Sequence, residues 1–177
     1  MRIIAGDRRG AKIAAPKGDT TRPTSDRVRE AAYNLIGPVD DAAVLDLFAG
    51  SGAMGLEALS RGARRCVFVE SDRAACKVIQ SNLEKLRLTG AIVLCKDAFQ
   101  GLREERGAGR TYDLVLVDPP YGAWRELEPR LAEVLPGALA PDGLLVVETT
   151  ARVEPELPLD LVTSRRYGSA RITLFTR

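Results

Sequence analysis

Short apolar runs alternate with amphipathic stretches from residue 43 almost to the end of the chain. The runs at 43–48, 65–70, 91–95, 112–118 and 143–149 have the length and residue types of buried strands. Stretches with apolar residues at helical spacing lie between or after them, at 53–62, 72–88, 98–104 and 124–135. Strands that alternate with helices predict an α/β fold with a mostly parallel sheet and helices on both faces.

The two ends of the chain depart from this alternation. Segments 160–168 and 170–176 predict an antiparallel pair at one edge of the sheet. At the other end, "RIIA" and "AKIAA" flank the turn "GDRRG" and predict a β-hairpin, followed by a helix over 27–36 with Ser25 or Asp26 as its N-cap. We therefore divide the chain into an N-terminal hairpin and helix, residues 1–40, and a main domain, residues 41–177.

Composition narrows the class of protein. The 177 residues are 45% hydrophobic and 28% charged, which is ordinary for a globular chain, and no apolar run is long enough to cross a membrane. The N-terminus lacks the apolar region of a signal peptide, so we expect a cytoplasmic protein. The three cysteines show no metal-binding spacing and are expected to be core thiols, so neither a disulfide framework nor a metal site is predicted.

Two features of charge and residue usage bear on chemistry. The chain contains no histidine, which excludes Ser-His-Asp and Cys-His catalysis and leaves carboxylates, backbone groups or a bound cofactor. Residues 1–30 carry eight Lys or Arg against four Asp or Glu, a charge of +4 in a chain whose total is +2. This basic N-terminal segment is either a solvated surface or a contact for phosphates.

The stretch "LDLFAGSG" combines an acid at a strand end with a glycine-rich turn. Asp46 comes near the end of the predicted strand, and Gly50 and Gly52 precede a predicted helix. Glycines permit a tight turn and close approach of a ligand, and a helix N-terminus favours an anionic group. Gly55 completes a G-x-G-x-x-G spacing, but the context is not that of the dinucleotide fingerprint. The turn therefore predicts a nucleotide or cofactor site, with a ligand-free βα turn as the alternative.

Two further acids follow the next two strands. Glu70 ends the second strand about twenty residues after the turn, where an acid can bind both hydroxyls of a ribose. Asp97 follows the third strand and is placed either to accept a hydrogen bond from an adenine amino group or to cap the next helix. Ligands bind open α/β sheets at the carboxyl ends of their strands, so these acids and Asp46 are expected to converge.

The fourth strand ends in "VDPPYG". Asp118 and the carbonyl of Pro119 are two adjacent acceptors, which suits an amino group with two N–H donors. Proline fixes the backbone, so Pro120 stiffens this position. Tyr121 offers a flat ring that can stack on a base. The alternative is a rigid exit from the strand with no ligand.

Together these blocks carry a family resemblance. "LDLFAGSG", the later acids and "DPPY" resemble Rossmann-like class I methyltransferases that methylate exocyclic amines. With "MRIIAGDRRG", "RPTSDRVREAAYNLI" and "LDLFAGSGAMGLEALSRGA", the chain more closely resembles the RsmD-type 16S ribosomal RNA guanine-N2 methyltransferases over its whole length. The resemblance implies a mostly parallel seven-stranded sheet, an N-terminal β-hairpin extension, and methylation of the guanine conventionally numbered 966.

The resemblance also implies a cofactor, partners and site residues. The cofactor is S-adenosylmethionine, the partner is 16S rRNA in the small ribosomal subunit or its assembly intermediate, and the protein acts as a monomer without a metal. The cofactor residues are Asp46, Phe48, Gly50, Gly52, Glu70, Ser71, Asp97, Ala98 and Asp118. The catalytic residues are Asp118, Pro119, Pro120 and Tyr121, and the RNA-binding residues are Arg8, Arg9, Arg22, Thr24 and Arg27.

Three other readings are open at the level of sequence. No cysteine follows a proline, which disfavours transfer to cytosine C5 through a covalent adduct, but the Asp-Pro-Pro-Tyr motif does not separate guanine N2 from adenine N6. An adenine-N6 methyltransferase acting on RNA or DNA is therefore one alternative. A non-catalytic RNA-binding module with a retained fold is another, and an NAD-binding protein is the third.

Overall fold

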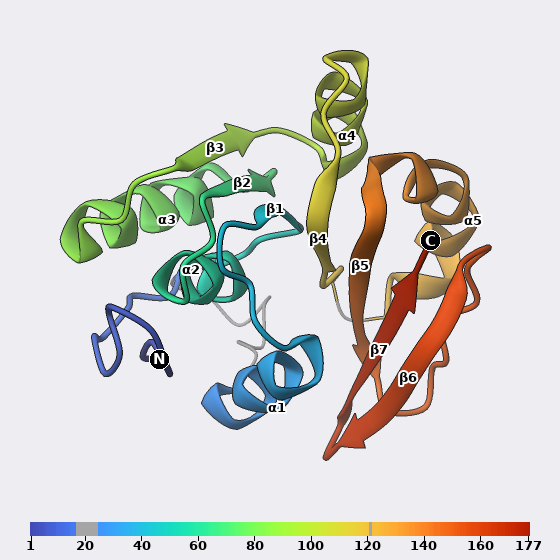
Figure 1. Ribbon diagram of the computed structural model, residues 1–177, viewed down its shortest axis with the longest axis horizontal. Helices are drawn as coiled ribbons and strands as arrows, with labels where there is room; N and C mark the ends of the chain where they lie inside the picture. Colours follow the sequence, from blue (N-terminus) through green and yellow to red (C-terminus); the bar gives the residue numbers. More distant parts are fainter. Residues whose placement is uncertain (17–24, 121) are drawn as a thin grey trace.

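A computed structural model describes residues 1–16, 25–120 and 122–177. One seven-stranded sheet runs through the molecule (Figure 1). Its strands are β1 (Ala43–Leu47), β2 (Arg65–Glu70), β3 (Ala91–Cys95), β4 (Tyr112–Val117), β5 (Leu139–Thr150), β6 (Asp160–Tyr167) and β7 (Ala170–Thr176). The helices are α1 (Asp26–Ile36), α2 (Ala53–Ser60), α3 (Arg73–Leu86), α4 (Ala98–Gly107) and α5 (Trp124–Val134), with a short 3-10 helix, η1 (Pro136–Ala138), after α5.

The strand order across the sheet is β3-β2-β1-β4-β5-β7-β6. Strands β1 to β5 are parallel to one another, whereas β7 runs antiparallel to both β5 and β6. The predicted mostly parallel sheet and its antiparallel terminal pair are thus confirmed. From β1, the strands β2 and β3 are added on one side of the sheet, and β4 and β5 on the other. The topological switch point, where such sheets bind ligands, therefore lies between β1 and β4.

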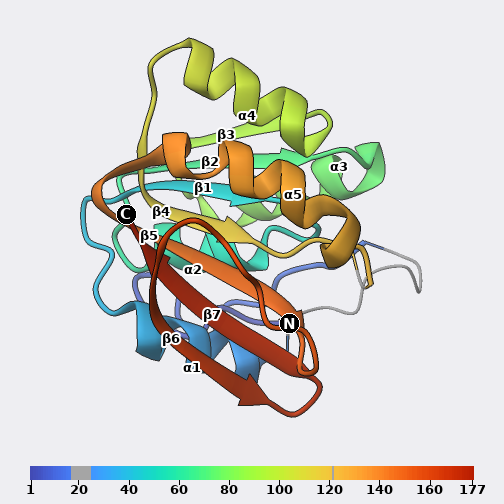
Figure 2. The same ribbon diagram turned by 90° about the vertical axis from the view of Figure 1, so that its right-hand side faces the viewer.

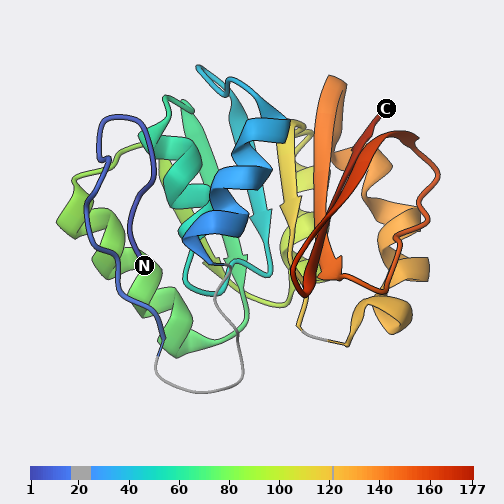
Figure 3. The same cartoon turned by 90° about the horizontal axis from the view of Figure 1, so that it is seen from below.

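Two apolar cores lie on opposite faces of the sheet. The first includes residues of α1, α2 and α3 together with alternate residues of the strands, such as Leu116 and Val146. The second includes the intervening strand residues, such as Val117 and Val147, with side chains of α4 and α5. Figures 2 and 3 show α1 and α2 lying against the face opposite to α4 and α5.

Local signals explain where several helices begin and end. Ser25 accepts a hydrogen bond from the Val28 N–H at 3.2 Å and caps α1, as predicted. Asp72 caps α3 in the same way, and Arg87 ends that helix in the left-handed region, with φ of 51°. Strand β5 begins four residues before the predicted one, because the segment with left-handed Asp142 remains paired with β4 through a register shift.

The N-terminal arm, residues 1–16, forms a hairpin that is shorter than predicted. Its two segments are joined by an isolated antiparallel bridge between Arg2 and Lys12 and not by full strands. Ile3 and Ile13 are buried in the same core as α1 and α2, so the arm packs directly on the main domain. Whether residues 1–40 form a separate unit remains a prediction.

The cysteines follow the expectation only in part. Cys66 and Cys76 are buried, as expected, but Cys95 is exposed. The difference arises because Cys95 lies at the end of β3, which is an edge strand.

Candidate active site

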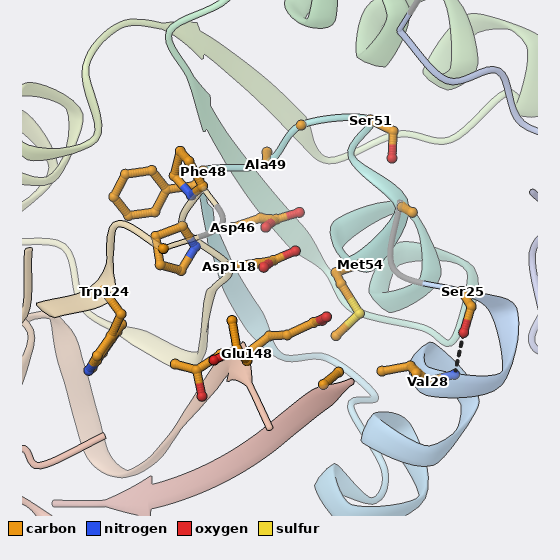
Figure 4. A pocket seen from close by; sticks show the side chains of 18 of the residues that line it. Ser25, Val28, Asp46, Phe48, Ala49, Ser51, Met54, Asp118, Trp124 and Glu148 are labelled. Atoms are coloured by element: carbon orange, nitrogen blue, oxygen red, sulfur yellow. Dashed lines mark hydrogen bonds between the residues drawn. The ribbon is translucent and has the colours of Figure 1, made fainter. Parts of the chain in front are cut away.

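A cavity of about 1240 Å³ opens at the carboxyl ends of the parallel strands, at the switch point of the sheet. Figure 4 shows side chains that line it. The walls come from the end of the N-terminal arm, α1, the turn after β1 and the start of α2, the ends of β2 and β5, the segments after β3 and β4, the start of α5, and the turn between β6 and β7. The predicted residues among them are Arg27, Asp46, Phe48, Gly50, Glu70, Ser71, Asp97, Ala98, Asp118, Pro119 and Pro120.

The turn after β1 has an unusual backbone. Phe48, Gly50 and Gly52 all have positive φ values, of 58°, 55° and 75°. A phenylalanine in this region is strained, and such strain is concentrated at functional sites. Gly52 is the N-cap of α2, and the first two residues of that helix, Ala53 and Met54, line the cavity, so the N-terminus of α2 lies next to it.

Asp46 lies at the floor of this turn and is 3% exposed. The Gly55 N–H donates a hydrogen bond to Asp46 Oδ2 at 3.0 Å. Burial raises the pKa of Asp46 to about 8, with a smaller raising effect from the nearby Glu70 and a lowering effect from the bond to Gly55. Near neutral pH this carboxyl therefore tends to hold its proton.

Glu70 joins the glycine turn to the second strand. The Gly50 N–H donates to Glu70 Oε2 at 2.8 Å, and the Asp72 N–H donates to Glu70 Oε1 at 2.8 Å. Each oxygen has a second lone pair that can accept from a ligand hydroxyl. Glu70 thus fixes the turn and also faces the cavity.

Asp97 is the N-cap of α4, which is one of the two roles that the sequence left open for it. Its Oδ1 accepts from the N–H groups of Phe99 at 3.0 Å and Gln100 at 3.2 Å. The same residue lines the cavity, together with the buried first residue of the helix, Ala98. Capping and ligand contact are therefore compatible.

The segment after β4 closes another wall. Asp118 is half-buried and Pro119 is buried. The side chains of Asp46 and Asp118 lie next to each other and point toward Met54 (Figure 4). Tyr121 lies outside the described residues.

The structure adds cavity residues that the sequence reasoning missed. Glu148, near the end of β5, and Trp124, at the start of α5, both line the cavity (Figure 4). Glu148 ends an apolar run in an acid, which is the signal that identified Asp118. Three exposed arginines also line the cavity, namely Arg125, Arg152 and Arg166.

The predicted RNA-binding residues fall into separate places. Arg27 lies on α1 at the cavity, and Arg9 is exposed on the turn of the arm. The Arg8 side chain donates to the carbonyls of Leu86 and Arg87 at the end of α3, which ties the arm to that helix. Arg22 and Thr24 lie outside the described residues.

The described residues contain neither a membrane-spanning helix nor a cluster of metal ligands. None of the helices in residues 1–16, 25–120 and 122–177 is long and apolar enough to cross a membrane. In the same part of the chain, no cluster of three or more Cys, Asp or Glu is arranged to hold a metal ion.

The strand order, the antiparallel β7 and the cavity beside the glycine turn define a Rossmann-like class I methyltransferase fold. A family model described as "Conserved hypothetical protein 95" matches residues 1–176. The chain belongs to this family, which is the RsmD family of S-adenosylmethionine-dependent methyltransferases.

Individual relatives agree with this assignment. The chain is 42% identical over 161 residues to ribosomal RNA small subunit methyltransferase D of Escherichia coli K12, covering 89% of this chain and 78% of that one. It is 32% identical over 170 residues to the protein of the same name from Haemophilus influenzae, covering 94% and 84%. A solved structure of a hypothetical protein from Thermus thermophilus superposes with a TM-score of 0.85 at 31% identity, covering 99% and 98%.

Proposed function

We propose that the protein transfers a methyl group from S-adenosylmethionine to the N2 amine of a guanine in 16S rRNA of the small ribosomal subunit, at the position conventionally numbered 966. One observation carries the proposal: Asp118 and Pro119 share a cavity with the glycine turn and the acids at the ends of β1 and β2. The acceptor for an amine and the predicted cofactor residues are thereby adjacent. The relatives named as small subunit rRNA methyltransferases support the choice of RNA.

The residues present fit the cofactor. The left-handed turn at Gly50 and Gly52 exposes backbone next to the N-terminus of α2, which suits the carboxylate of a methionine group. Glu70 lines the cavity, and each of its carboxylate oxygens accepts one backbone N–H and keeps a lone pair, which suits the two hydroxyls of a ribose.

The contacts of the remaining cofactor residues follow from their places. Asp97 and the N–H of Ala98 would hold the adenine edge, and Ser71 lies beside Glu70 on the ribose side. Phe48 would form one side of the cofactor site at the turn. The buried Asp46 holds the turn in place by accepting the hydrogen bond from Gly55. The cofactor, when bound, supplies an electrophilic methyl group.

Asp118 and Pro119 act on the other reactant. The Asp118 carboxylate and the Pro119 carbonyl would accept hydrogen bonds from the two N–H groups of the guanine amine. These contacts orient the amine and stabilise positive charge as it develops on nitrogen. The proton leaves the nitrogen after transfer, so no histidine is needed. Pro120 holds the segment rigid, and we assign to Tyr121 the stacking of the guanine outside its RNA stack.

The charge around the cavity suits RNA. Exposed arginines line the cavity, so phosphates can be held outside while one base enters. The four residues of this arginine rim are Arg27, Arg125, Arg152 and Arg166. We also retain Arg8 and Arg9 of the N-terminal arm, together with Arg22 and Thr24 further along the chain, as a second contact for rRNA phosphates.

The test is methyl transfer to small ribosomal subunits that lack the modification, followed by nucleoside mass spectrometry of the rRNA. We expect N2-methylguanosine at one position. N6-methyladenosine would instead establish the adenine-N6 alternative, and the absence of any methylated nucleoside would favour a non-catalytic RNA-binding module. In the same assay Asp118→Ala should abolish transfer while affinity for S-adenosylmethionine, measured by calorimetry, changes little. Full activity of that variant would show that Asp118 has only a structural role.

A further inference from the structure

Glu148 lies next to Asp118 through the register of two parallel strands. Val117, the last residue of β4, is paired with Val147 of β5, so Asp118, directly after β4, lies beside Glu148, the next residue of β5. Neighbouring strands lie about 4.8 Å apart. Both residues line the cavity, and Figure 4 shows Glu148 on the wall near Asp118.

Strand alternation places both side chains on the same face of the sheet. Leu116 and Val146, two residues earlier on each strand, belong to the core under α1 and α2. Residues two apart on a strand face the same side, so Asp118 and Glu148 face that side too. A flat ring whose amine is held by Asp118 would therefore present a neighbouring edge atom to Glu148.

The edge atom beside the amine differs between the two candidate bases. In guanine the ring nitrogen next to the N2 amine, N1, carries a hydrogen and is a donor. In adenine the ring nitrogen next to the N6 amine, also N1, is an acceptor. An ionised carboxylate accepts hydrogen bonds and cannot donate them, so a second carboxylate beside Asp118 complements guanine and opposes adenine.

We propose that Glu148 reads the N1–H of guanine and so selects guanine over adenine as the base to be methylated. This inference rests on the proposed function, because it assigns specificity within the same site. Asp118 and Pro119 bind the amine common to both bases, whereas Glu148 tests the atom beside it. A site built to bind a donor discriminates against a base that presents an acceptor at that position, because two acceptors then face each other.

The experiment uses small subunits reconstituted from 16S rRNA assembled from ligated segments, with either guanosine or 2-aminopurine riboside at the target position. 2-Aminopurine keeps the N2 amine but its N1 has no hydrogen. We expect the wild-type protein to prefer guanosine by about 10- to 100-fold in kcat/KM. Glu148→Gln should reduce this preference about tenfold, because the glutamine amide can donate to the bare N1. Glu156→Gln, which changes an exposed acid outside the cavity, should keep it.

A binding measurement separates recognition from catalysis. Subunits with inosine at the target position carry N1–H but no N2 amine, so they cannot be methylated. They should inhibit the wild-type protein competitively, and Glu148→Gln should raise the inhibition constant about tenfold. Thermal unfolding followed by circular dichroism checks that this variant is folded.

The outcomes distinguish this inference from the function on which it rests. If unmodified subunits with guanosine receive no methyl group, the proposed function fails and the inference fails with it. If guanosine is methylated but the wild-type protein uses 2-aminopurine equally well, only the role of Glu148 is overturned. That result needs no variant, so it holds even if Glu148→Gln does not fold.

Discussion

The backbone N–H of Gly55 donates to Oδ2 of the Asp46 carboxyl group at 3.0 Å, and the surrounding atoms leave no room for a side chain at residue 55. A Cβ there would lie 2.4 Å from the ring of Phe68, 2.7 Å from the Cys66 sulfur and 2.9 Å from Asp46 Oδ2. Gly55 therefore lets α2 pack closely on β1 and β2. The third glycine of the sequence spacing serves packing and the support of Asp46.

We predict that Gly55→Ala destabilises the protein by about 1–3 kcal/mol, because the added methyl group overpacks a filled core. The midpoint of thermal unfolding should fall by several degrees. Gly107→Ala is the matched control, since Gly107 is also helical and nothing lies within 4 Å of an added Cβ. The control should be neutral or slightly stabilising. Equal midpoints for both variants would show that the space around Gly55 adapts.

Asp46 should give the free energy of unfolding a distinctive pH dependence. Burial raises its pKa to about 8 in the folded chain, against about 3.9 in an unfolded one. Between pH 5 and 7 the folded chain holds a proton that the unfolded chain releases. The contribution of this residue to stability therefore falls as pH rises, by about 1.4 kcal/mol for each pH unit.

Asp46→Asn removes that contribution while its amide oxygen can still accept from Gly55. Relative to the wild-type protein, the variant should become more stable as the pH is raised from 5 to 7. Urea unfolding at pH 5, 6 and 7, without added cofactor, measures this difference. A difference that stays constant with pH would mean that Asp46 is ionised in the folded protein.

The sequence predicted those site residues that could be recognised from their position at the end of a single strand. Asp46, Glu70, Asp97 and Asp118 each follow an apolar run, and parallel strands bring such ends to one edge of the sheet. Glu148 was not predicted, although its run also ends in an acid. The role that we infer for Glu148 depends on the register of β5 against β4, which the order of the strands in the chain does not determine.

The N-terminal arm shows a second limit of sequence reasoning. Its basic residues and turn were visible, but its docking depends on contacts with residues more than fifty positions away. Glu57 of α2 accepts from the N–H groups of Ile4 and Ala5, and Arg8 reaches the end of α3. Local sequence patterns give no signal for such long-range pairs. Arg8, one of the basic residues of the arm, therefore has a structural role that the sequence did not reveal.

Glu57 should be critical for this docking. It is fully buried, bonds to Ile4 and Ala5 at 2.8 and 2.9 Å, and pairs with Arg61 at 2.8 Å and the buried Arg29 at 3.6 Å. Glu57→Gln leaves the charge of Arg29 less compensated and turns an amide group toward N–H donors. We expect a loss of about 3 kcal/mol in the free energy of unfolding.

Urea unfolding measures that loss, and hydrogen exchange at the amides of Ile4 and Ala5 should become faster than in the wild-type protein. Glu84→Gln, an exposed change on α3, is the control and should alter neither quantity. If exchange in the arm is unchanged by Glu57→Gln, the arm is held mainly by its buried apolar residues.

The arginine rim should contribute directly to RNA binding. Arg152 and Arg166 are exposed at the cavity, so replacing both by glutamine should weaken binding to 16S rRNA and lower the slope of log affinity against log salt by about 1.4–1.8. Arg103→Gln with Lys77→Gln removes the same charge from exposed positions outside the cavity and should change the slope little. Equal slopes for both double variants would mean that no rim contact is specific.

Arg8→Gln should lower the midpoint of thermal unfolding, because the hydrogen bonds from Arg8 to the end of α3 are lost. If Arg8→Gln also lowers the slope of log affinity against log salt, the N-terminal arm contacts phosphates as well.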